Sequence, residues 1–299
     1  ASIYLMAEEE EEYRERFAAL LEPAFSGLVG SGLVTVAVSG DVFASPSSKQ
    51  ICSGVDLAPT DKGIVTIVLN YTGDCLNFGL ASEKARSAFH SEGKGRDIEM
   101  VNVGDDVSVG RSKGGLVGRR GLTGAAFTAK VLGAASEKGD DVQKIAHLGR
   151  TMVKNFVTVG SSLDHCHVPG RSTDPKERGA LSQSAVEIGM GIHNEPGAKH
   201  IENKPSGEDL IKEMLELLLR EDDPERSFVK FNKDDDPVLI INNLGGMSSI
   251  ELGAIAAEAR TQIERDWNLR LSRVYCGTYV TSLNAPGFNI SLLNHKRVS

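Results

Sequence analysis

Two loops carry the side chains best suited to chemistry in this sequence of 299 residues. The first is the run 70–74, which ends in Asp74 and directly follows an apolar stretch ending at Leu69. In open α/β sheets, ligands bind at the carboxyl ends of the strands, so this position favours an aspartate that reaches a ligand. Capping of the following helix is an equally open interpretation of Asp74.

The second loop is the segment 191–197, which places His193 between glycine and proline residues that restrict the backbone. A neutral imidazole is nucleophilic near pH 7 and is the side chain best suited to proton transfer at that pH. The loop therefore predicts either a catalytic histidine or a structural histidine held in a turn.

Two further segments have the composition of a site but not its spacing. Asp164, His165, Cys166 and His167 put two imidazoles on one face of a strand, but no paired ligands of a zinc site follow, so we expect a polar loop without metal. The run 110–115 is rich in glycine and basic residues but lacks the phosphate-loop spacing, which favours a flexible loop.

Short β-branched runs alternate with helical patterns in the first half of the chain. This rhythm predicts a mostly parallel α/β sheet. The expected strands are 33–38, 63–69 and 98–103, and the expected helices are 81–90, 122–138 and one that begins near 141 with an apolar stripe continuing to 156.

A polar, breaker-rich segment at 171–180 separates a second half with a different pattern. Ser206 is placed to cap a helix, and further elements follow at 237–241, 250–267, 271–276 and 288–293. We therefore predict an α/β fold of two domains: an acidic segment at 1–20, a mostly parallel α/β domain at 21–170, and a smaller α+β domain at 171–299 that carries His193.

The charge and cysteine content exclude several classes of protein. A net charge of −8 disfavours nucleic acid as a partner, and part of it lies in the acidic run 8–16, which is typical of a solvated helix or tail. No stretch approaches the roughly 20 apolar residues of a membrane span. The four cysteines form no paired motif and the amino terminus lacks a signal-peptide pattern, so we expect a soluble, cytoplasmic protein.

Seven motifs, in this order and spacing, resemble the substrate-binding domain of the dihydroxyacetone kinases over residues 22–294. The resemblance implies two α/β-type domains, a homodimer, and a histidine, matching His193, that adds to a ketone carbonyl as a covalent hemiaminal. It also implies that Asp74 is the active-site aspartate, which accepts a proton from the ligand's hydroxyl. The motifs are 39–46, 70–78, 103–106, 118–121, 168–170, 191–197 and 242–246.

Three positions depart from the family pattern. Leu21 replaces a histidine of a glycine-rich loop, Leu69 replaces a lysine, and Asn194 replaces a glycine. Losing a positioned acid or base typically costs about 10²- to 10⁴-fold in rate, so the changes at Leu21 and Leu69 predict impaired phosphorylation and a preference for ligands with an apolar side. The ligand-binding positions implied by the resemblance are Leu21, Glu22, Asp41, Leu69, Thr72 and Gly73.

Three functions follow from this resemblance. The chain is the hydroxyketone-binding subunit of a kinase, a non-catalytic carbonyl-ligand regulator, or an enzyme that uses His193 and Asp74 as an acid-base pair to isomerise or cyclise another carbonyl compound. The chain lacks a phosphate loop and ends soon after Leu293. We therefore expect it to bind no cofactor itself and to receive ATP and magnesium through a separate nucleotide-binding subunit.

Overall fold

The computed structural model describes residues 17–22, 27–58, 62–91, 93, 97–168, 170, 172, 174 and 180–298, with residues 17–22 described by their backbone alone. The acidic run 8–16 and most of the polar segment 171–180 lie outside the described residues. The chain forms two compact units, the first from 1–104 and 125–153 and the second from 105–124 and 154–299. Within the described residues, no helix is both long and apolar enough to span a membrane.

The first unit is built on a parallel sheet of four strands in the order β2-β1-β3-β4. All residues of β3 are buried and most are β-branched or leucine, which is typical of a strand covered on both faces. The predicted strand 63–69 is confirmed. The strands are β1 (Phe17–Glu22), β2 (Val36–Val42), β3 (Gly63–Leu69) and β4 (Asp97–Val103).

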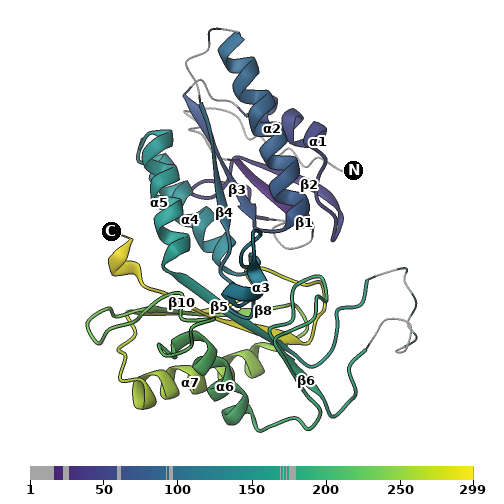
Figure 1. The fold of residues 1–299 in the computed structure, drawn as a ribbon, viewed down its shortest axis with the longest axis vertical. Coiled ribbons are helices and arrows are strands. Elements are labelled where there is room, and N and C mark those ends of the chain that lie inside the picture. Colours follow the sequence, from purple (N-terminus) through teal and green to yellow (C-terminus); the bar gives the residue numbers. More distant parts are fainter. Residues whose placement is uncertain are drawn as a thin grey trace. The chain divides into compact units, whose positions relative to one another are not determined.

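Helices lie on both faces of this sheet, with α1 and α2 on one side and α4 and α5 on the other (Figure 1). Ser47 and Gln50 form a reciprocal capping box at the start of α1, a helix that the sequence analysis did not predict. The helices are α1 (Ser48–Leu57), α2 (Thr72–Ser91), α4 (Gly124–Glu137) and α5 (Val142–Lys154).

The second unit contains a mixed sheet of six strands in the order β7-β6-β5-β10-β8-β9. β10 is antiparallel to both of its neighbours, β5 and β8, whereas β8 and β9 are parallel. The strands are β5 (Phe156–Ser162), β6 (Val186–Ile188), β7 (Lys199–Ile201), β8 (Val238–Asn243), β9 (Arg273–Gly277) and β10 (Gly287–Leu293).

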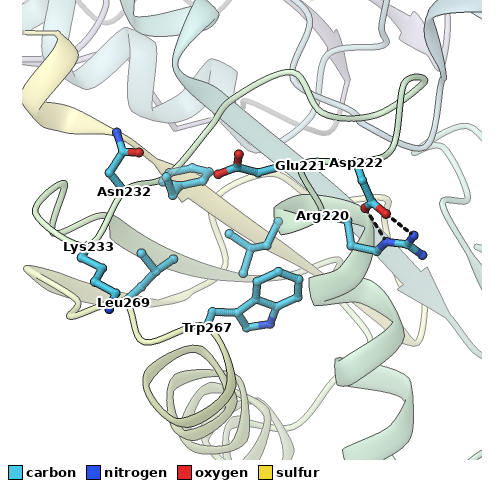
Figure 2. A pocket seen from close by; sticks show the side chains of 9 residues that line it. Arg220, Glu221, Asp222, Asn232, Lys233, Trp267 and Leu269 are labelled. Carbon is cyan, nitrogen blue, oxygen red and sulfur yellow. Dashed lines mark hydrogen bonds and ion pairs between the residues drawn. The ribbon is translucent and has the colours of Figure 1, made fainter.

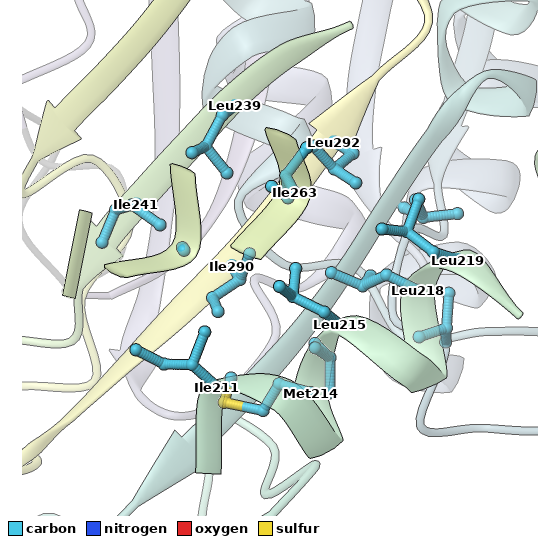
Figure 3. Close-up of a cluster of buried hydrophobic side chains, with 14 of the residues drawn as sticks. Ile211, Met214, Leu215, Leu218, Leu219, Leu239, Ile241, Ile263, Ile290 and Leu292 are labelled. Atoms are coloured by element: carbon cyan, nitrogen blue, oxygen red, sulfur yellow. The ribbon is translucent and has the colours of Figure 1, made fainter. Parts of the chain in front are cut away.

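Helices α6 (Gly207–Leu219) and α7 (Ser249–Asp266) pack their apolar sides against this sheet, and Figure 3 shows part of the resulting core. Met214 and Leu215 of α6 and Ile290 of β10 are fully buried there. The side chain of Ser206 accepts a hydrogen bond from the Asp209 amide, which confirms the predicted cap of α6. Two short helices, α3 (Arg111–Gly114) and the 3₁₀ helix η1 (His295–Arg297), complete the unit.

The compact units divide elsewhere than at the boundary near 170 suggested by the sequence. The apolar stripe assigned to one helix up to 156 belongs to two elements, because α5 ends at Lys154 and Phe156 begins β5. β5 pairs with β10 along its whole length, so it belongs with the carboxyl-terminal half of the chain. The second unit therefore extends beyond the segment 171–299.

Candidate functional site

The carboxyl edge of the parallel sheet gathers several of the predicted ligand-binding positions. β1 lies between β2 and β3, and its register places Glu22 opposite Val42. Leu21 and Glu22 therefore end β1 at the same edge where Asp41 lies near the end of β2 and Leu69 ends β3. The fold brings together backbone positions that are far apart in the sequence.

Asp74 lies in the first turn of α2, which begins at this edge, and its side chain is only 2% exposed. It follows two helical residues, Thr72 and Gly73, so it occupies the third helical position rather than the N-cap position. A Cβ atom on Gly73 would lie 2.5 Å from Ser45 Oγ, so glycine permits the close approach of the loop after β2. A carboxylate in the first turn is also stabilised by the helix dipole.

Leu69 packs into the protein at the end of β3 and is 2% exposed. The next residue is fixed on both sides, because the Asn70 amide donates to the Val103 carbonyl at 2.9 Å and the Cys75 thiol donates to Asn70 Oδ1 at 3.2 Å. Burial and the charge of Asp74 raise the pKa of the Cys75 thiol. The thiol is therefore held protonated, as a donor, at neutral pH.

His193 lies in a tight turn of the second unit. The Asn194 amide donates to the Gly191 carbonyl at 3.1 Å, and the Gly191 amide donates to the Glu195 carbonyl at 3.0 Å. A side chain on Gly191 would collide with the Glu195 carboxylate, and its Cβ would lie 2.7 Å from Arg120 Nη1. Glycine at this position is therefore required by close packing.

Glu195 holds the imidazole of His193, a role that the sequence analysis missed. His193 Nδ1 lies 2.8 Å from Glu195 Oε1, and the His193 amide donates to Glu195 Oε2 at 3.0 Å. A carboxylate at Nδ1 favours the tautomer with its proton on that nitrogen, which leaves the lone pair on Nε2. The available signal was a carboxylate two residues after a histidine in a glycine-flanked loop.

The environment of Glu195 favours its charged form. Burial alone would raise the pKa of Glu195, but the hydrogen bond and charge of His193 lower it below the ordinary value. Because the folded pKa lies below the unfolded one, the interaction stabilises the fold at neutral pH. That contribution is lost as the pH falls through the folded pKa of Glu195.

Arg120 supports the backbone that leads into the His193 turn. Its guanidinium forms an ion pair with the buried Asp106 at 2.7 Å and donates to the Gly189 carbonyl at 2.6 Å. The Ser108 hydroxyl donates to the same carbonyl at 3.2 Å. The motifs at 103–106 and 118–121 thus meet in space and hold the start of the 191–197 loop.

We expect replacement of the neighbouring Asp105 by alanine to destabilise the fold by about 3–5 kcal/mol. The Asp105 carboxylate is fully buried. It accepts hydrogen bonds from the Leu122 amide at 2.7 Å, the Gly124 amide at 2.9 Å and the Thr158 hydroxyl. Alanine leaves all three donors without their acceptor. Urea unfolding followed by circular dichroism measures the change, and a loss under about 1 kcal/mol contradicts this role.

The sequence also singled out the segments 164–167 and 110–115. In the described part of the chain, no group of three or more His, Cys, Asp or Glu side chains is arranged to hold a metal ion. In the glycine-rich run 110–115, the amide and hydroxyl of Ser112 donate to Glu225 Oε2 at 2.9 and 2.7 Å. A carboxylate therefore already occupies donors that a phosphate would use.

A groove of about 710 Å³ lies elsewhere on the second unit, at the ends of α6 and α7 (Figure 2). Its described lining residues include none of the predicted site residues. Its rim carries an ion pair in which Arg220 binds both carboxylate oxygens of Asp222 at 3.0 Å. The lining residues are Leu219, Arg220, Glu221, Asp222, Phe231, Asn232, Lys233, Trp267 and Leu269.

The chain is similar in sequence to known proteins. A protein-family model of the Dak1 domain matches residues 21–298. The chain is 44% identical over 286 residues to the dihydroxyacetone kinase of Pichia angusta. It belongs to the dihydroxyacetone kinase family. A human relative of the family, named triokinase/FMN cyclase, is 36% identical over 274 residues.

The fold agrees with a solved structure of the dihydroxyacetone kinase family. The dihydroxyacetone kinase of C. freundii, in complex with AMP-PNP and Mg²⁺, matches 95% of this chain and 50% of its own, with a TM-score of 0.78 and 29% identity. The predicted two-domain α/β fold is thereby confirmed. The P. angusta and human matches cover 92% and 91% of this chain but only 46% and 45% of those relatives.

Proposed function

We propose that this chain binds a small hydroxyketone through His193 and presents its hydroxyl for phosphoryl transfer. The observation that carries the proposal is the 2.8 Å contact between His193 Nδ1 and Glu195 Oε1, because it directs the nucleophilic lone pair to Nε2. The family of the chain supports this class of ligand, since its relatives include dihydroxyacetone kinases.

The proposed attachment is a reversible addition. The Nε2 lone pair forms a bond to the ketone carbon, the π electrons of the carbonyl move onto its oxygen, and that oxygen takes a proton from solvent. The imidazole then carries a positive charge, which the carboxylate of Glu195 stabilises. Only ketones and aldehydes form this bond, so it distinguishes a hydroxyketone from the similarly shaped polyol glycerol.

Asp74 is proposed to act on the same ligand as general base for its terminal hydroxyl. A buried carboxylate at the start of a helix is held in one place, which suits a group that must meet a hydroxyl proton. The exposed Asp41, Thr72 and Gly73 are proposed to contact the ligand's polar atoms. Leu21 and Leu69, which replace polar residues of the family pattern, are proposed to favour ligands with an apolar side.

The phosphoryl donor and the assembly complete the proposal. ATP with magnesium is supplied by a separate nucleotide-binding subunit or domain, and the chain forms a homodimer. The outermost strand β9 supports a self-association surface, because Val274 and Tyr275 are 40% and 44% exposed on it. Calorimetry with ATP and magnesium tests whether the chain alone binds nucleotide. Sedimentation of the purified chain tests whether it forms a dimer.

Calorimetric titration tests the proposed ligand class. Dihydroxyacetone and the less polar 1-hydroxy-2-butanone are expected to bind, with the second binding more tightly, whereas glycerol is expected to give no saturable heat. The reason is that glycerol offers hydroxyls but no carbonyl carbon. Equal binding of glycerol, or no binding of either ketone, contradicts the proposal.

The second candidate function is an acid-base reaction on a carbonyl compound. It is supported by the name of the human relative, triokinase/FMN cyclase, which includes a cyclase activity. In this case, His193 and Asp74 exchange protons with the ligand without phosphoryl transfer. Incorporation of deuterium from D₂O next to the carbonyl, detected by NMR without any nucleotide, would favour this candidate. Binding without exchange or turnover would favour a carbonyl-ligand regulator.

A further inference from the structure

Asn194 has an unusual backbone conformation for a residue with a side chain. Its φ is 64°, in the left-handed region that glycine adopts freely and asparagine tolerates better than most residues. It follows His193 directly, and a glycine at this position would adopt the same backbone conformation without strain. The turn itself therefore does not need the asparagine side chain, which must be explained by its contacts.

The side-chain amide of Asn194 pairs with the backbone of Cys166. The Cys166 amide donates to Asn194 Oδ1 at 3.0 Å, and Asn194 Nδ2 donates to the Cys166 carbonyl at 3.4 Å. Cys166 is 3% exposed, and the following residue, His167, donates its amide to Asn284 Oδ1 at 2.8 Å. The partner segment is thus itself anchored within the second unit.

We propose that Asn194 is a positioning residue that fastens the His193 turn to the segment at Cys166 and thereby prolongs the attachment of a hydroxyketone to His193. The inference rests on the proposed function. A glycine at this position keeps the turn but lacks both hydrogen bonds, so the turn can open while the ligand is bound. Two neutral hydrogen bonds together correspond to roughly a tenfold change in the opening equilibrium.

The test compares three variants with the parent protein. Asn194→Gly keeps the left-handed backbone and removes both hydrogen bonds, so the dissociation rate of dihydroxyacetone is expected to rise about tenfold, with little change in the association rate. Asn194→Asp keeps the acceptor for the Cys166 amide and is expected to give an intermediate rate. Asn268→Gly is the matched control, because Asn268 is an exposed residue of the same unit with a φ of 51°.

Saturation-transfer NMR measures the ligand's dissociation, and hydrogen exchange of the Cys166 amide reports on the fastening without any ligand. Faster exchange and faster dissociation in Asn194→Gly, with Asn268→Gly unchanged, support the inference. If the parent binds dihydroxyacetone and Asn194→Gly releases it at the same rate as the parent, the inference is wrong and the proposed function stands. A parent that binds no hydroxyketone overturns both, while the exchange data still show whether Asn194 fastens the turn.

Discussion

Replacing His193 by alanine is expected to weaken hydroxyketone binding by roughly 100-fold or more, about 2.8 kcal/mol. The substitution removes the Nε2 nucleophile, and the hydroxyls of so small a ligand provide little affinity without the covalent bond. Calorimetry with 1-hydroxy-2-butanone measures the loss. Glu195→Gln is expected to have a smaller effect in the same direction, because its amide keeps a hydrogen bond to Nδ1 without the negative charge.

The chain offers a closely matched control for His193→Ala. His200 lies in the same unit, is followed two residues later by a glutamate, and contacts Glu202 Oε1 at 3.2 Å, but its side chain is 44% exposed. His200→Ala therefore removes a similar histidine-glutamate pair outside the site and is expected to leave affinity unchanged. If His193→Ala is folded and binds the ketone as tightly as His200→Ala does, His193 is structural.

Replacing Asp74 by asparagine is expected to lower phosphoryl transfer by about 10²- to 10⁴-fold, the usual effect of losing a positioned base. Asparagine has nearly the same shape as aspartate, so a buried position at the start of α2 tolerates it, but the amide cannot accept a proton. Turnover is measured with ATP, magnesium and a nucleotide-binding subunit of the family added to the chain.

Measuring ligand binding distinguishes loss of the base at Asp74 from loss of the folded structure. Because Asp74 acts after the ketone is bound, Asp74→Asn is expected to retain hydroxyketone binding while losing turnover. Asp56→Asn, at an exposed residue of α1, serves as the control for the substitution itself. Turnover of Asp74→Asn within about threefold of Asp56→Asn would show that Asp74 is not the base.

Local patterns predicted some of the elements that local interactions determine, but not α1, although its capping box is local. The strand 63–69 was evident because every residue of β3 is apolar or β-branched, and the cap at Ser206 was evident because its partner Asp209 is three residues away. The boundary between α5 and β5 was not evident, because apolar residues at helical spacing continue through Phe156. Only pairing with the distant β10 reveals that Phe156 starts a strand.

The candidate site shows the same limit. The sequence identified Asp74 and His193 as chemical groups but not the residues that position them. The role of Glu195 was not predicted, because its carboxylate reaches the His193 imidazole only through the turn at 191–195. Arg120 was part of a recognised motif without a role, since its contact with the Gly189 carbonyl joins segments far apart in the chain.

The central claim is a covalent bond between His193 and a ketone carbon, and NMR of dihydroxyacetone labelled with ¹³C at its carbonyl tests it most directly. On binding, the labelled carbon is expected to leave the ketone region of the spectrum and appear in the region of tetrahedral carbons bonded to nitrogen and oxygen. His193→Ala should abolish that signal, and His200→Ala should retain it. A bound ligand whose labelled carbon stays in the ketone region, or a tetrahedral signal that persists in His193→Ala, would contradict the account.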